Sequence, residues 1–180
     1  MVGDCPNGHR KLKVMLCGKD WCPDCGKIGS WIHQRRCKRL LPDLKSLAAD
    51  AGGYLGYLVV TVPEEYREWL LNKENLASFR RYLVEFLKRQ GYDRGIRVWH
   101  WAGDDGKTWK PHLNFIIAEK YIAPVILREW KELFTAWLVR KSKIPIKKTI
   151  VFNYQYSNEL GKHRHWLRYI TRATLREYNP

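Results

Sequence analysis

The segment that most constrains the architecture is RVWHWAGDDGKTWKPHLNFIIA, residues 97–118. Residues 96–101 and 112–117 are rich in Val, Ile, Phe and Trp, and the Ala-Gly-Asp-Asp-Gly segment between them has the composition of a turn. We therefore expect an antiparallel β-hairpin. If its loop closes symmetrically, His100 lies opposite His112. Asn114 then shares a face with His112, because side chains in a strand repeat every second residue.

This register brings three nitrogen and oxygen donors onto one face of the hairpin. Cross-strand neighbours have Cβ atoms roughly 5 Å apart, so His100, His112 and Asn114 could bind one divalent metal ion. The alternative is that His112 and Asn114 are ordinary half-buried polar residues on a solvated sheet face. A one-residue slip would turn the whole set over, so the spacing alone leaves both interpretations open.

Composition limits the class of protein. A chain of 180 residues can form one domain with a core and a small appendage. Its 45% hydrophobic and 13% aromatic residues indicate a folded protein rather than a disordered one. The 33 Lys and Arg against 18 Asp and Glu give a net charge of +15. This excess favours a polyanionic partner, most often nucleic acid, with an anionic membrane surface as the lesser option.

The sequence also bears on the compartment. No apolar run approaches the roughly 20 residues that span a bilayer, and the N-terminus lacks the order of charge and apolarity of a signal peptide. We therefore expect a cytoplasmic protein without a membrane partner. In that compartment its five cysteines are more often metal ligands than disulfides.

Residues 1–27 form a distinct segment rich in potential zinc ligands. Cys22-Pro-Asp-Cys25-Gly has the form of a zinc knuckle, and Cys5-Pro-Asn-Gly-His9 resembles a second, looser hook. So short and polar a segment cannot bury enough surface to fold unaided, and bound Zn²⁺ would supply the missing free energy. We expect Cys22 and Cys25 as ligands, with two more from Cys5, His9 and Cys17. A redox C-x-x-C is the alternative, which the additional Cys and His nearby disfavour.

A basic helix is expected next, over residues 28–51, as a connection to a domain formed by residues 52–180. Arg35 and Arg36 belong to a run of basic residues that is either an ordinary solvated face or a phosphate-binding track. His33 and Cys37 are four residues apart on this helix and could join a metal site, although such a pair is usually incidental.

The remaining elements alternate in a recognisable order. Residues 54–62 read as a buried strand stopped by Pro63, and the segment from residue 64 to 91 reads as a helix. After the hairpin come a helix that begins at Pro124, a strand over 146–154 and a helix over 159–178. The order β-α-β-β-α-β-α predicts the ferredoxin-like α+β plan, an antiparallel sheet with helices on one face and the other face open for a ligand.

The last predicted helix carries a candidate nucleophile. His165, Tyr169 and Arg172 fall at i, i+4 and i+7 and therefore share one helix face. A phenol with an ordinary pKa near 10 needs a nearby cation or metal to act as a nucleophile. The alternative is that a tyrosine on a basic helix is simply amphipathic surface.

Four segments together resemble the HUH superfamily of single-strand-nicking endonucleases, in particular the rolling-circle replication initiators (Rep) of small plasmids and viruses. Residues 58–63, LVVTVP, resemble the first motif, L-T-x-T-x-P. Residues 110–115, KPHLNF, resemble the second, H-P-H-x-H or His-hydrophobic-His. Residues 165–172, HWLRYITR, resemble the third, Y-x-x-K-Y-x-x-K. Residues 17–25, CGKDWCPDC, resemble the cysteine-rich segment that precedes the first strand in many plasmid Reps.

Four departures from these motifs bear on the candidate site. Asn114 stands where the second histidine is usual, and an amide oxygen suits Mg²⁺ or Mn²⁺. His165 stands in the place of the first tyrosine, so the chain resembles a one-tyrosine enzyme with Tyr169 as nucleophile. Arg168 and Arg172 replace lysines, which keeps the charge and changes the hydrogen-bond geometry. His100 matches the place of the third metal ligand on the neighbouring strand.

The resemblance implies site-specific nicking and joining of single-stranded DNA or an origin hairpin through a 5′-phosphotyrosine. It implies catalytic Mg²⁺ or Mn²⁺, structural Zn²⁺, a prokaryotic host cytoplasm, and a host helicase and polymerase as partners. Side chains that could contact the DNA are Trp99, Trp101, Trp109, Arg35, Arg36 and Arg168.

Two other functions fit the same sequence. One is a non-catalytic, zinc-containing DNA- or RNA-binding protein whose HUH fold is degenerate, which the His-Leu-Asn sequence at residues 112–114 keeps open. The other is an RNA-binding module of the RRM type, which shares the β-α-β-β-α-β order. Such a module should carry exposed aromatic residues in a K/R-G-F-G-F-V-x-F context, and none is present.

Overall fold

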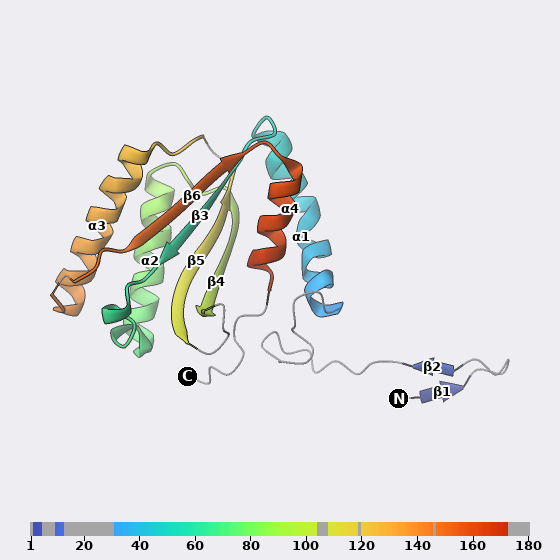
Figure 1. Cartoon of the computed structure of the whole chain (residues 1–180), viewed down its shortest axis with the longest axis horizontal. Helices are drawn as coiled ribbons and strands as arrows, with labels where there is room; N and C mark the ends of the chain where they lie inside the picture. The colour runs from blue at the N-terminus through green and yellow to red at the C-terminus, as the bar shows by residue number, and fades with distance from the viewer. Residues whose placement is uncertain are drawn as a thin grey trace.

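The computed structural model of the protein describes residues 2–4, 10–12, 31–103, 108–118, 120–145 and 147–172. These residues form an α+β fold with a four-stranded antiparallel sheet and four α-helices, as expected from the sequence (Figure 1). Two short strands, β1 (Val2–Asp4) and β2 (Arg10–Leu12), form a separate antiparallel pair. None of the described helices combines the length and apolarity needed to cross a membrane.

The sheet has the strand order β4-β5-β3-β6, and every neighbouring pair is antiparallel. Its strands are β3 (Leu55–Thr61), β4 (Gly95–Ala102), β5 (Trp109–Ile117) and β6 (Val151–Ser157). The predicted hairpin is β4–β5, and its register is the symmetrical one: His100 pairs with His112 and Val98 pairs with Asn114. The prediction that these three polar side chains share a face is therefore confirmed.

Two helices cover one face of the sheet. Leu58, Val60 and Val62 alternate along β3 and the residue after it, and with Leu113 and Phe115 of β5 they form the sheet side of the larger core. Against them pack the apolar residues of α2 (Lys73–Arg89) and α3 (Pro124–Ser142). The most deeply buried of these helical side chains are Phe79, Leu83, Leu87, Phe134 and Leu138.

The other face is also covered, by α1 (Trp31–Asp50) and α4 (Leu160–Ile170), which lie side by side (Figure 1). The prediction of helices on one face only was therefore wrong. The reason is that β3 is apolar on both faces: Leu55, Tyr57 and Val59 point away from the larger core and need their own cover. Leu44 of α1 and a row of α4 residues supply it, forming a second core. The α4 row comprises Trp166, Leu167 and Ile170.

Local chemistry explains where the helices begin and end. Helix α1 ends before Gly52 and Gly53, which adopt left-handed φ angles of 62° and 89°. We expected a helix from residue 64, but two 3₁₀ turns, η1 (Glu64–Tyr66) and η2 (Trp69–Leu71), precede α2. The α-helix begins only after Asn72, whose side chain accepts hydrogen bonds from the backbone N–H groups of Glu74 and Asn75.

The last strand and helix also differ from their predicted bounds. Strand β6 begins at Val151 rather than at residue 146, because it pairs with β3 from Thr61↔Val151 to Leu55↔Ser157. This pairing extends the strand three residues beyond its predicted end. Helix α4 begins one residue after its predicted start, and it ends at Ile170 rather than at residue 178.

Candidate active site

Two histidines face each other across the β4–β5 hairpin on the side covered by α4. His100 and His112 are buried, and their ring centroids are 5.0 Å apart in an edge-to-face arrangement. His112 Nδ1 lies 2.7 Å from the carbonyl oxygen of Lys110, and His100 Nε2 lies 2.9 Å from that of Ile170. In a neutral imidazole the nitrogen at a carbonyl is the donor, so the lone pair is on the other ring nitrogen. Backbone contacts of this kind are typical of metal-binding histidines.

Asn114, on the same face, is completely buried and contacts a tyrosine that the sequence analysis did not single out. Tyr57 of β3 donates a 2.7 Å hydrogen bond from its hydroxyl to Asn114 Oδ1. Asn114 Nδ2 has no hydrogen-bond partner among the described residues. Because a tyrosine hydroxyl both donates and accepts, the carboxamide can turn over, keep its contact with Tyr57 and present Oδ1 to a cation instead.

Tyr169 of α4 lies over the same face of the sheet, next to His100 and Tyr57. Its half-buried ring lies 5.9 Å from the ring of His100 and 6.5 Å, edge-on, from that of Tyr57, measured between centroids. Arg172 Nη2 donates to the Tyr169 hydroxyl at 2.7 Å, and the guanidinium carbon is 3.8 Å from the centre of the phenol ring. A cation in this position would stabilise negative charge on the phenol oxygen, which a tyrosine needs in order to act as a nucleophile.

Helix α4 is fixed on both sides. Toward the sheet, the indole of Trp166 stacks on Tyr57 with centroids 5.4 Å apart. Toward α1, His33 Nε2 bonds the carbonyl oxygen of Arg168 at 2.8 Å, and Cys37 Sγ lies 3.0 Å from the Thr171 hydroxyl. His33 and Cys37, considered as possible metal ligands, therefore both bind the last turn of α4. That turn carries Tyr169.

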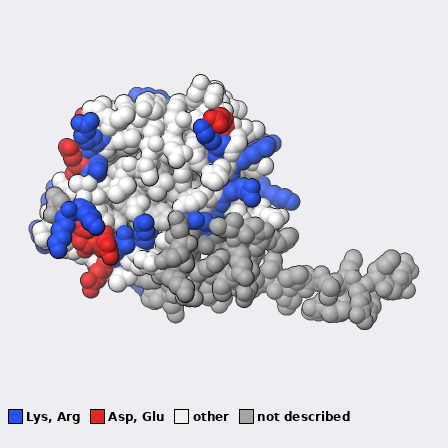
Figure 2. Space-filling view, in the orientation of Figure 1, with Lys and Arg blue, Asp and Glu red and all other residues white. Residues whose placement is uncertain are grey.

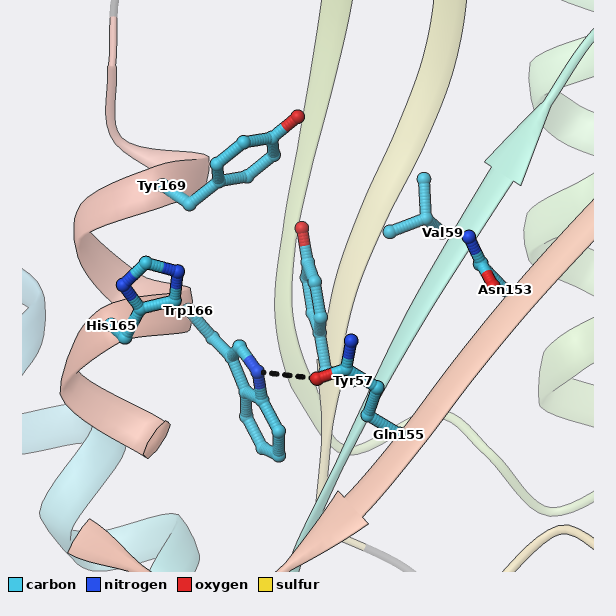
Figure 3. Close-up of a pocket in the computed structure, with 7 residues that line it drawn as sticks. All are labelled: Tyr57, Val59, Asn153, Gln155, His165, Trp166 and Tyr169. Atoms are coloured by element: carbon cyan, nitrogen blue, oxygen red, sulfur yellow. Dashed lines mark hydrogen bonds between the residues drawn. The ribbon is translucent and has the colours of Figure 1, made fainter. Parts of the chain in front are cut away.

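A pocket of about 290 Å³ opens beside Tyr169 (Figure 3). One wall comes from α4 and consists of His165, Trp166 and Tyr169. The floor comes from cross-strand pairs of β3 and β6, in which Tyr57 lies opposite Gln155 and Val59 opposite Asn153. Along β3, Leu58 and Val60 point into the larger core, so Tyr57 and Val59 face the other way. Strand alternation alone could therefore have identified Tyr57.

The chain matches no known family model, no curated protein and no solved structure.

Possible metal ligands divide into two groups. In the described part of the chain, no cluster of three or more His, Cys, Asp and Glu side chains could hold an ion, so a cation at the hairpin would depend on the amide of Asn114 beside the two histidines. The predicted zinc ligands Cys5, His9, Cys17, Cys22 and Cys25 all lie outside the described residues.

The predicted DNA-contacting tryptophans lie on the opposite face of the hairpin. Trp99, Trp101 and Trp109 form a ladder with successive ring centroids 5.7 and 5.9 Å apart, and the Arg80 guanidinium lies over the first two rings. Trp109 also donates to the carbonyl oxygen of Arg67. A base stacked on this ladder would therefore not lie at the histidine pair.

The predicted basic contacts lie on the helices that cover the candidate site. Arg35 and Arg168 are exposed, whereas Arg36 is half-buried and donates to the carbonyl oxygen of Thr171. Helix α4 carries three basic residues and no acidic one. Figure 2 shows lysine and arginine side chains gathered over α4 and α1.

Proposed function

We propose that the protein nicks and rejoins single-stranded DNA through a covalent bond to Tyr169, as an initiator of rolling-circle replication. One observation carries the proposal: the phenol of Tyr169, with Arg172 on its oxygen, lies next to His100, which faces His112 across a hairpin. The strand order β4-β5-β3-β6 also matches that of two β-α-β halves in the ferredoxin-like plan of HUH endonucleases. A basic surface over α4 and α1 would attract the DNA.

The reaction is a phosphoryl transfer that conserves the energy of the phosphodiester. The Tyr169 oxygen attacks the phosphorus, a tyrosine–phosphate bond forms, and the bond to the 3′ oxygen breaks. The phenolic proton passes to solvent, and the departing 3′ oxygen gains a proton to become a hydroxyl that can prime synthesis. Attack by a later 3′-hydroxyl reverses the step and rejoins the strand. Arg172 offsets charge on the phenol oxygen before the attack.

A divalent cation fits the donor set on the sheet face. His100, His112 and Asn114 would hold Mg²⁺ or Mn²⁺, because backbone carbonyls orient both imidazoles and because the Asn114 carboxamide can turn over, donate from Nδ2 to the Tyr57 hydroxyl and present Oδ1 to the ion. Such an ion, when bound, polarises the scissile phosphate. The protein's own part is to place Tyr169 over this face: His100 bonds the carbonyl of Ile170, the residue after the nucleophile.

The decisive experiment looks for the covalent intermediate. The whole protein is incubated with Mn²⁺ and a pool of single-stranded oligonucleotides, and adducts are separated on a denaturing gel. We expect an adduct with the wild-type protein and with Tyr156→Phe, a tyrosine of β6 outside the site, but none with Tyr169→Phe. His112→Ala should abolish the adduct while single-stranded DNA still binds. An adduct that survives in Tyr169→Phe would rule out this assignment.

The second candidate is a nucleic-acid-binding protein without catalysis. It is favoured by Asn114 at the place of the second histidine and by the lack of a third His, Cys, Asp or Glu near the pair in the described residues. In that case the wild-type protein should bind single-stranded DNA with a steep salt dependence and yield no adduct under any metal condition.

A further inference from the structure

The pocket beside Tyr169 suits one part of a DNA substrate, a single base. We propose that it holds a nucleobase adjacent to the scissile phosphate and recognises the carbonyl edge of that base through Gln155. This inference rests on the proposed function, because it takes Tyr169 as the residue that meets the phosphate. It goes further by assigning sequence preference to residues of β6 that no motif includes.

The walls of the pocket suit a flat heterocycle. Tyr57 and Trp166 already stack on each other with their rings only 20° from parallel, and the ring of Tyr169 meets Tyr57 edge-on. The volume of about 290 Å³ lies just below the roughly 300–1,000 Å³ of sites for whole small molecules, which suits a single base. Stacking on aromatic side chains is sequence-tolerant, so these walls provide affinity for a base but do not choose among bases.

Gln155 is the residue that would distinguish one base from another, because a hydrogen bond sets the orientation of its amide. Its Oε1 accepts a 3.2 Å hydrogen bond from Trp166 Nε1 (Figure 3). An indole nitrogen can only donate, so the amide cannot turn over without losing this bond. The two N–H donors of Nε2 are therefore the part of the amide that can meet a ligand. These donors can reach the carbonyl oxygens of thymine, cytosine and guanine, whereas adenine has no carbonyl oxygen and offers them only ring nitrogens. We therefore expect adenine to be the least favoured base.

The neighbouring residues are consistent with a base at this place. Asn153 lies two residues from Gln155 on the same strand face and adds an exposed amide at the rim. His165 and Tyr169 line the pocket one helical turn apart on α4. A nucleotide whose base lies on the β3–β6 floor would therefore have its backbone next to the Tyr169 hydroxyl.

The test measures binding in a protein that cannot cleave. In the Tyr169→Phe background, the affinity for the oligonucleotide is measured with an abasic site placed in turn at each position. We expect one position, next to the nick mapped with the wild-type protein, at which base loss weakens binding about tenfold. Adenine at that position should also bind more weakly than the other three bases.

Gln155→Glu is the informative variant. The carboxylate can still accept from Trp166, but it replaces the N–H donors with an acceptor, so the preference for a carbonyl base should disappear. Gln90→Glu, an exposed residue at the end of α2, makes the same change of charge elsewhere and should keep the preference. If Gln155→Glu unfolds, Gln155→Met removes the donors at similar length and should give the same loss.

The outcomes separate this inference from the proposed function. A base preference that persists unchanged in the Gln155 variants, or the lack of any base-dependent position, would overturn the pocket assignment even if the wild-type protein forms an adduct. A preference that depends on Gln155 in a protein that forms no adduct would support the pocket and overturn the nuclease. A protein that forms no adduct has no nick to map, so in that case the base-dependent position is located by the abasic scan alone. A chain that binds no single-stranded DNA would overturn both.

Discussion

Tyr57 connects the two halves of the candidate site. Its hydroxyl donates to Asn114 beside the histidine pair, and its ring forms part of the pocket between Trp166 and Tyr169. One side chain thus contacts a possible metal ligand, the helix that carries the proposed nucleophile, and the proposed base site. A change at Tyr57 should affect several of these features, and the kind of change determines which ones.

Tyr57→Phe should separate the hydroxyl from the ring. The variant keeps the stacking with Trp166 but leaves Asn114 Oδ1 buried without this donor, so we expect the free energy of unfolding to fall by about 1–3 kcal/mol. Adduct formation should then require a higher Mn²⁺ concentration, because the carboxamide is no longer held. Denaturant unfolding and a Mn²⁺ titration measure the two effects. Tyr54→Phe, an exposed tyrosine, is the control, and an equal loss there would contradict the role assigned to Tyr57.

Arg172 gives a second prediction for a single residue. Its guanidinium donates to the Tyr169 hydroxyl, so Arg172→Gln should slow adduct formation about 100- to 1,000-fold, with little change in DNA affinity. Arg172→Lys keeps the charge but loses the planar donor group and should recover part of the rate. Single-turnover rates at saturating DNA provide the measurement. Arg164→Gln, on the exposed side of α4, should leave the rate unchanged, and a similar loss there would indicate a general effect of charge.

At the scale of elements, the contact between α1 and α4 determines where Tyr169 lies. The last turn of α4 is held through His33 and Cys37 of α1 and through His100 of β4. Each of these bonds ends on a residue next to, or two away from, Tyr169. The position of Tyr169 therefore depends on tertiary contacts made by the end of a short helix.

His33→Ala should loosen that turn. The carbonyl of Arg168 loses its 2.8 Å contact with His33 and keeps only the longer, 3.3 Å bond from the Thr171 hydroxyl. We therefore expect about 0.5–1.5 kcal/mol less stability and faster hydrogen exchange of the backbone amides of residues 167–171. Adduct formation should slow, while the affinity for single-stranded DNA stays within about twofold. Lys38→Ala, an exposed residue of the same helix, should change none of these quantities. Unchanged exchange at the end of α4 in His33→Ala would mean that α1 does not hold the nucleophile.

The hairpin shows how far the sequence alone could lead. A symmetrical loop and period-two alternation were enough to predict that His100 faces His112, since both are local properties of two adjacent strands. That α1 and α4 cover the second face of the sheet could not be predicted in the same way. The apolar residues of α1 are interleaved with basic ones, so its sequence resembles that of a solvated helix. The pocket was missed because Gln155 belongs to a part of β6 whose strand pairing is set by distant β3.

For the whole molecule, the net charge of +15 predicts that the affinity of the protein for single-stranded DNA falls steeply as the salt concentration rises. For single strands, the slope of log K against log salt concentration is near −0.7 for each phosphate that the protein neutralises. If DNA lies across α4, Arg164→Gln and Arg168→Gln should each make the slope shallower by about 0.7, because both side chains are exposed there.

Arg128→Gln, exposed on α3 over the opposite face of the sheet, carries the same change of charge and should leave the slope unaltered. Binding titrations at several salt concentrations measure this directly. A slope that responds to Arg128 but not to the α4 residues would place the DNA on the α2–α3 side, away from Tyr169, and would contradict the proposed active site as a whole.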